Sequence, residues 1–129
     1  MQAILDTSVF IAREQERPLG DLPDEVAVSV VTLSELRHGV LAAAGHEQMA
    51  RRLSTLEVAR QIAAPLVIDE SVGDDLARLR VALKAVGRAM KVMDAWIAAT
   101  AMSHGAAVCT QDEDFDAAAE AGLIEVKRV

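Results

Sequence analysis

The sequence predicts an α/β fold in which helices cover both faces of a central parallel sheet. Short apolar runs rich in β-branched residues alternate with longer segments whose apolar residues recur at helical spacing. This alternation is typical of parallel sheets, because successive parallel strands need a crossover connection that is usually a helix. The length of 129 residues suits one domain, and we expect residues 1–129 to form it.

The expected elements follow from apolar periodicity and from residues that begin or end helices. We expect strands at residues 2–5, 26–31, 66–68, 107–109 and 124–127. We expect a helical turn to residue 11, then helices at 33–44, 48–63, 72–86 and 95–103, and a short helix ending at 121. The segments Thr32–Glu35 and Thr110–Glu113 both match a capping box, which predicts that helices start there.

Composition excludes several classes of protein. The formal net charge of −7 argues against generic, charge-driven binding to nucleic acid. A single cysteine cannot form an internal disulfide, and no apolar run is long enough to span a membrane, so we expect a cytoplasmic protein. Residues 78–91 nevertheless carry five Lys or Arg side chains and no acid. This run, together with Arg37, is a candidate for contacts to a phosphate backbone.

Acidic residues recur where expected strands give way to helices. Asp6 ends a strand, and Asp94 begins a helix. Glu35 and Asp112 are expected in the first turns of helices that follow strands. Because the carboxyl ends of parallel strands share one edge of a sheet, all four carboxylates should lie at that edge. Clustered carboxylates repel one another unless a cation lies between them, and oxygen-only ligands favour Mg²⁺ or Mn²⁺.

Three segments of the chain, ILDTSVFIA, SELRHG and DAWIAATA, resemble motifs of the PIN-domain ribonucleases, and specifically of the VapC toxins of bacterial toxin–antitoxin pairs. The resemblance extends from Ile4 to about Val126. It implies a PIN-like three-layer α/β/α fold and a Mg²⁺- or Mn²⁺-dependent endoribonuclease. The metal-binding carboxylates that it implies are Asp6, Glu35, Asp94 and Asp112, with Thr110 ordering the site. In the segment TQDEDFD, Asp114 is the second choice after Asp112.

The same resemblance implies the substrate and the partners. RNA would be cleaved to leave a 5′-phosphate and a 3′-hydroxyl. A cognate VapB-type antitoxin would block the site with its C-terminal tail and dock on the helices expected at residues 33–44 and 49–63. The toxin itself would form a homodimer.

Two alternatives from other functional classes also fit an acidic sheet edge. A receiver-like signalling domain binds Mg²⁺ beside an acceptor aspartate and uses a lysine at a late strand end. In this chain Lys127 lies too near the terminus to fit that role well, and Glu35 would have none. A catalytically inactive binding module, in which the acids only cap helices, predicts no metal-dependent change in stability.

Overall fold

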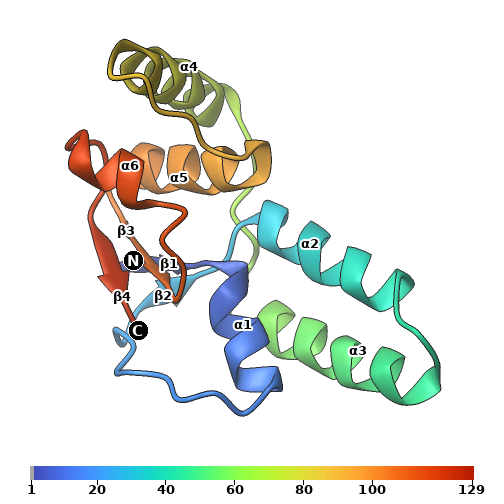
Figure 1. The fold of residues 1–129 in the computed structure, drawn as a ribbon. Helices are drawn as coiled ribbons and strands as arrows, with labels where there is room; N and C mark the ends of the chain where they lie inside the picture. The colour runs from blue at the N-terminus through green and yellow to red at the C-terminus, as the bar shows by residue number, and fades with distance from the viewer. Residues whose placement is uncertain (1) are drawn as a thin grey trace.

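A computed structural model describes residues 2–129 and shows a parallel sheet between two layers of helices (Figure 1). The strands are β1 (Ala3–Leu5), β2 (Val26–Ala27), β3 (Ala107–Thr110) and β4 (Val126–Arg128). They lie in the order β2-β1-β3-β4, and every neighbouring pair is parallel. The helices are α1 (Thr7–Glu14), α2 (Val30–Leu41), α3 (His46–Arg60), α4 (Glu70–Ala85), α5 (Val92–His104) and α6 (Asp116–Glu120). The predicted α/β/α fold class is therefore confirmed.

The strands divide the core into two apolar clusters, because successive side chains of a strand point to opposite faces. Ile4 and Val108 face the first cluster, where they pack with residues of α4, α5 and α6. Leu5 and Cys109 face the second cluster, where they pack with residues of α1, α2 and α3. Both clusters are built largely from small and branched aliphatic side chains, as the aromatic content of 2% requires.

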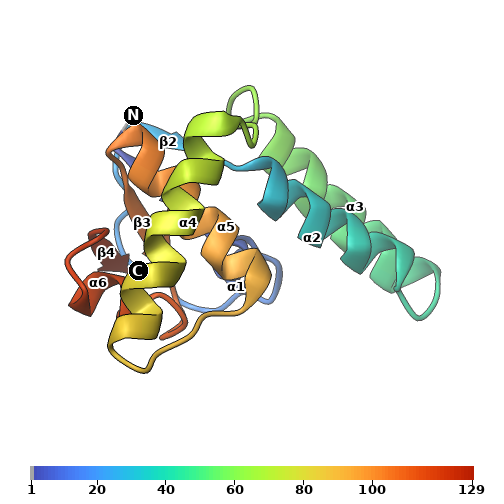
Figure 2. The same ribbon diagram turned by 90° about the horizontal axis from the view of Figure 1, so that it is seen from above.

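Helices α2 and α3 pair with each other and extend away from the sheet as an antiparallel arm (Figure 2). Arg52 fastens the arm, since its Nη1 donates a hydrogen bond of 2.7 Å to the carbonyl oxygen of Gly39. The base of α2 lies beside the start of α5, at the same edge of the sheet as the carboxyl ends of the strands (Figure 1).

The expected strand at residues 26–31 was wrong in its second half. Only Val26–Ala27 is strand, and α2 already begins at Val30. The reason is the buried Ser29, whose side chain accepts a hydrogen bond of 3.2 Å from the amide of Thr32 and so caps the helix. Thr32 is therefore inside the helix, and the expected capping box of Thr32–Glu35 does not exist.

Two other expectations also need correction. Residues 66–68 form no strand; Leu66 makes only an isolated bridge to Ser29. The expected capping box of Thr110–Glu113 is absent as well, because Thr110 ends β3 and α6 begins only at Asp116. The remaining differences are shifts of one to three residues at the ends of elements, where propensity is a weak guide.

The cap of α2 gives a test of this local structure. Replacing Ser29 with alanine should lower the free energy of unfolding by about 1–2 kcal/mol, because the Thr32 amide then stays buried without an acceptor. Chemical denaturation followed by circular dichroism measures this loss. Ser34→Ala, at an exposed position of the same helix, is the matched control and should change stability by less than about 0.5 kcal/mol. Equal losses in the two variants would contradict the assignment of Ser29 as the cap.

Candidate active site at the carboxyl edge of the sheet

Asp6 lies where β1 ends and α1 begins, and it is 4% exposed. The hydroxyl of Thr110, the last residue of β3, donates a hydrogen bond of 3.0 Å to Asp6 Oδ2. The amide of Ser8 donates to the same oxygen at 3.4 Å, so that the Asp6 carboxylate caps α1. Burial raises the pKa of Asp6 above its ordinary value, although these hydrogen bonds lower it in part. The carboxylate is thus held in one orientation in a site that disfavours its charge.

A chain of hydroxyl groups runs from the loop after β3 to Asp6. Thr110 has one hydroxyl hydrogen and gives it to Asp6, so Ser8 must be the donor in the 3.1 Å contact between Ser8 Oγ and Thr110 Oγ1. Ser8 Oγ in turn accepts from the amide of Gln111 at 3.0 Å, and Thr110 Oγ1 accepts from the amide of Asp112 at 3.0 Å. These bonds tie the ends of β1 and β3 together, so that the orientation of Asp6 is set by groups on both strands.

Glu35 reaches the same edge from α2. It lies in the second turn of that helix and not in the first turn, as was expected, because α2 begins earlier than predicted. The hydroxyl of Thr7 donates a hydrogen bond of 2.7 Å to Glu35 Oε1, and it lies 3.4 Å from the hydroxyl of the buried Thr32. Burial raises the pKa of Glu35, and the nearby charge of Asp6 raises it further.

Asp94 is in the first turn of α5, which begins at Val92. Its pKa is raised to about 6, first by burial and then by the negative charges of Asp6, Asp114 and Glu35, while Lys91 partly opposes the shift. Acids from three separate segments therefore act on one carboxyl group. Such mutual effects arise only when the groups share one site, which brings Asp6, Glu35 and Asp94 together at the carboxyl edge.

The loop between β3 and α6 carries the last two candidates, and the structure distinguishes between them. Asp112 is exposed, its amide is bonded to Thr110, and it is not among the charges that raise the pKa of Asp94. Asp114 is among those charges. Asp112 also lies in this loop and not in the first turn of a helix, contrary to expectation. Both side chains are exposed, so the effect of its charge on Asp94 is what favours Asp114 over Asp112 as the fourth carboxylate of the site.

The donor set of this edge fits a hard cation. Its groups are carboxylate and hydroxyl oxygens, which are the ligands that Mg²⁺ and Mn²⁺ prefer. Within residues 2–129, however, no three acidic, histidine or cysteine side chains already converge at metal-binding distances. Like charges separate when no cation lies between them, and Glu35 is meanwhile held by Thr7. Binding a cation here would therefore require small side-chain movements.

Sequence reasoning missed the positioning roles of Thr7, Ser8 and Thr32. Each is a common capping or turn residue, so its presence in the sequence does not indicate a role in positioning a carboxylate. For Thr7 and Ser8 the sequence does contain one signal. Both directly follow Asp6 at a predicted strand end, a place from which side chains can contact the ends of neighbouring strands and helices.

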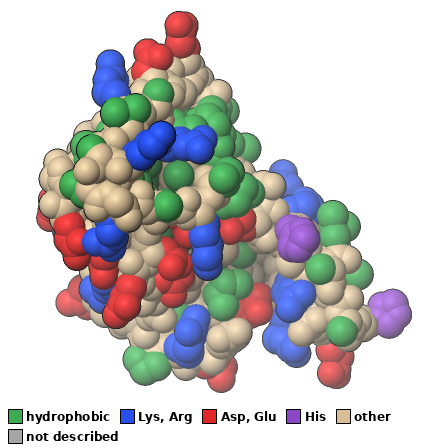
Figure 3. All heavy atoms as spheres, turned by 45° about the horizontal axis from the view of Figure 1, so that its top comes forward, with side chains coloured by type: hydrophobic (Ala, Val, Ile, Leu, Met, Phe, Trp, Pro, Cys, Tyr) green, Lys and Arg blue, Asp and Glu red, His purple; other side chains and the backbone are tan. Residues whose placement is uncertain are grey.

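The face around this edge is mixed in character. Figure 3 shows acidic and basic side chains beside each other near its middle, with an apolar patch and further Lys or Arg side chains next to them. Arg37 contributes to a separate hollow between α2 and α3, which it shares with Arg60. The expected role of Arg37 in contacting phosphates is therefore not tied to the carboxylate site by this geometry.

Comparison with known proteins agrees with the fold and with the order of these elements. Among the described residues, no helix has the length and apolar character needed to cross a membrane. The model of the PIN domain family matches residues 3–121. Two curated proteins of Mycobacterium tuberculosis are similar over nearly the whole chain: Ribonuclease VapC5, 48% identical over 98% of this chain and 94% of its own, and Ribonuclease VapC4, 46% identical over 97% of each.

A solved structure extends the comparison to three dimensions. The crystal structure of VapBC-5 from Mycobacterium tuberculosis, a member of the VapBC family of toxin–antitoxin systems, includes a chain that superposes with a TM-score of 0.88. That chain is 46% identical, and each chain is covered completely. The match includes every element that contributes a candidate carboxylate. The chain therefore belongs to the PIN-domain family, in the group of the VapC proteins.

Proposed function

We propose that this chain is a metal-dependent endoribonuclease of the VapC toxin type. The observation that carries the proposal is the convergence of Asp6, Glu35, Asp94 and Asp114 at one edge of the sheet, where their charges act on one another. Repulsion among these carboxylates lowers the stability of the fold unless a bound cation offsets it. Clustered carboxylates with shifted pKa values mark functional sites. The similar curated proteins are named ribonucleases, which gives the reaction class.

The proposed ligands of Mg²⁺ or Mn²⁺ are Asp6, Glu35, Asp94 and Asp114, with Asp112 as the remaining candidate. A bound cation supplies Lewis-acid activation of a water molecule and of the scissile phosphate. Asp6 is held toward the site by Thr110, and Glu35 by Thr7, so neither has to be ordered when substrate arrives. In-line attack would leave a 5′-phosphate and a 3′-hydroxyl, and no side-chain nucleophile is needed.

The proposed partner is a cognate VapB-type antitoxin. The similar solved structure is from a toxin–antitoxin family, which supports this proposal. The arm of α2 and α3 offers exposed apolar side chains: Leu41 is 75% exposed, Met49 40% and Leu53 41%. A docked antitoxin helix would bury them. We also propose that the toxin forms a homodimer, that residues 1–129 form one domain, and that the protein is cytoplasmic.

RNA cleavage tests the proposed activity directly. Purified, antitoxin-free protein should cut total RNA into discrete fragments when Mg²⁺ or Mn²⁺ is present and not when EDTA is present. Asp6→Asn should lower the rate at least about 100-fold, because it removes one charged ligand while keeping its shape. Ser34→Ala is a control and should cleave normally. An absence of cleavage by well-folded wild-type protein with either metal would favour the inactive binding module.

The pKa of Asp94 gives a prediction about stability. Because the folded-state pKa of about 6 lies above the ordinary value of 3.8, ionising Asp94 opposes folding. The penalty is absent below about pH 4, grows between pH 4 and 6, and is complete above pH 6. Asp94→Asn should therefore stabilise the chelated protein by ~1–2 kcal/mol at pH 7, allowing for partial exposure, and should abolish cleavage.

Thermal melts of wild type and Asp94→Asn in EDTA across pH 4 to 8 measure this effect. The difference in Tm should increase up to about pH 6 and then stay constant. Excess Mg²⁺ should raise the Tm of wild type and reduce the difference. A variant that melts lower than wild type in EDTA at pH 7 would contradict the repulsion between these carboxylates.

The fourth carboxylate can be identified by comparing two neighbouring variants. Asp114→Asn should reduce both cleavage and the Mg²⁺-induced rise in Tm, because Asp114 acts electrostatically on Asp94. Asp112→Asn should change each by less than about threefold, since its charge is not among those that act on Asp94 and only its amide is bonded to Thr110. If Asp112→Asn instead gives the larger loss, the order originally predicted from the sequence is the right one.

A further inference from the structure

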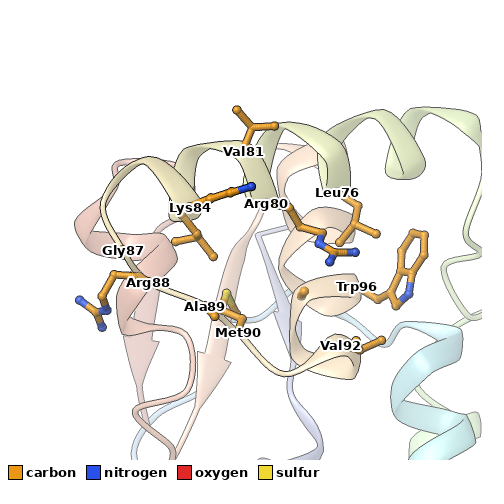
Figure 4. Close-up of a pocket in the computed structure, with 12 residues that line it drawn as sticks. Leu76, Arg80, Val81, Lys84, Gly87, Arg88, Ala89, Met90, Val92 and Trp96 are labelled. Carbon is orange, nitrogen blue, oxygen red and sulfur yellow. The ribbon is translucent and has the colours of Figure 1, made fainter.

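A hollow of about 530 Å³ lies between the end of α4, the following loop and the start of α5 (Figure 4). Its interior is apolar, with Leu83, Met90 and Ala95 among the lining residues. Trp96 and Val92 stand at the end of the hollow nearer to α2 (Figure 4). The carboxylate site described above does not use any of these side chains.

The rim of the hollow is positively charged. Arg80, Lys84 and Arg88 line it, and none of the described residues that line it is acidic. Arg88 is paired with Glu120 at 2.6 Å, whereas Arg80 and Lys84 form no ion pair with any of residues 2–129. The net charge of the chain is −7, so two unpaired cations beside an apolar hollow make this part of the surface positive in a protein that is negative as a whole. They favour an anionic ligand with apolar parts.

The hollow is joined to the candidate active site through α5. Asp94 lies between Val92 and Trp96 in the first turns of this helix, and because residues two apart on a helix point to different sides, the carboxyl group and the indole ring lie on different sides of α5. Helix α2, which carries Glu35, contacts α5 at this end. A polymer that crosses the carboxylates and continues around the start of α5 can therefore place a neighbouring unit in the hollow.

We infer that this hollow is a subsite for an unpaired base of the RNA substrate. The base stacks on Trp96 and the apolar lining, and the adjoining phosphates contact Arg80 and Lys84. The inference rests on the proposed function, because it concerns the substrate of that same site. Unpaired bases are commonly bound on aromatic side chains beside cations, and each stacked base contributes enough to change affinity roughly tenfold.

An acidic, apolar protein segment is the competing occupant. Val81, which is 71% exposed, and Val86 at 63% would suit it. RNA is favoured for two reasons. The two unpaired cations match a repeating phosphate chain, and Trp96 stands at the end of the hollow nearer to α2, the helix that carries Glu35 (Figure 4).

Trp96 is the only tryptophan of the chain, so its fluorescence reports on the hollow alone. The protein for this experiment is Asp6→Asn, which keeps RNA intact. Single-stranded oligoribonucleotides should quench the fluorescence in a saturable way, whereas inorganic polyphosphate, which has the charge without bases, should bind without comparable quenching. Equal quenching by polyphosphate, or none by a bound oligoribonucleotide, would overturn the base subsite.

Two double variants distinguish RNA binding at the hollow from nonspecific binding by positive charge. Arg80→Ala with Lys84→Ala should weaken binding of labelled RNA about tenfold or more and make it less dependent on salt. The matched control, Arg13→Ala with Arg51→Ala, removes the same charge from α1 and α3 and should have a much smaller effect. Equal losses in the two double variants would overturn the inference.

Cleavage by the otherwise wild-type enzyme completes the test. Trp96→Leu, verified as folded by its melting curve, should raise KM about tenfold with a smaller change in kcat, and should alter the choice of cleavage sites. Unchanged KM and unchanged sites would overturn the base subsite while metal-dependent cleavage upholds the proposed function. Quenching by an acidic apolar peptide but not by RNA would assign the hollow to a protein partner. If the wild-type protein neither cleaves nor binds RNA, the proposed function itself is rejected.

Discussion

Repulsion among carboxylates at the carboxyl edge of the sheet is the constraint on which the rest of the structure depends. Parallel strands bring the ends of β1 and β3 to one edge, and α2 and α5 deliver Glu35 and Asp94 to the same place. The cost is visible in Asp94, whose pKa is raised to about 6 by burial first and then by the charges of the other acids. A fold that keeps these acids together in spite of that cost must hold them with other contacts, and the structure shows which contacts these are.

At Asp6 and Glu35 the side-chain contacts are made by hydroxyl groups, whereas Lys91 acts on Asp94 through its charge. Thr110 and Ser8 fix Asp6, and Thr7 fixes Glu35. A hydroxyl can donate to a carboxylate without neutralising it, so it orients the group and leaves its charge available to a metal ion. Lysine or arginine in these positions would relieve the repulsion but would compete with the cation. The threonine and serine residues thus fix the orientation of the carboxylates and still leave their charge available.

The sequence allowed a prediction of the fold class and of most candidate carboxylates, because these depend on local and repeated signals. Apolar periodicity indicated the strands and helices, and the rule that strand ends meet at one edge placed Asp6, Glu35 and Asp94 together. The start of α2 was predicted three residues late, because Ser29 and Thr32 are both good caps and only the hydrogen bond from the Thr32 amide to the Ser29 side chain shows which one caps the helix.

The choice between Asp112 and Asp114 could not be made from the sequence for a similar reason. Both lie in a loop, where neither periodicity nor capping fixes the direction of a side chain. Only the structure shows that the amide of Asp112 is drawn back to Thr110 while Asp114 acts on Asp94. The supporting hydroxyls were also missed, since their partners are distant in sequence: Thr7 and Glu35 are 28 residues apart, and Ser8 and Thr110 are 102 apart.

The division of the core into two clusters determines which core substitutions can alter the spacing of the carboxylates. Glu35 belongs to a helix whose Leu36 and Val40 pack on one side of the sheet, whereas Asp94 is followed by Ala95 and Ile97, which pack on the other. The gap between the two carboxylates is therefore set by the thickness of the layers between them. A core substitution that leaves every acid intact can still alter that gap, so side-chain volume deep in either layer affects the geometry of the site as the acids themselves do.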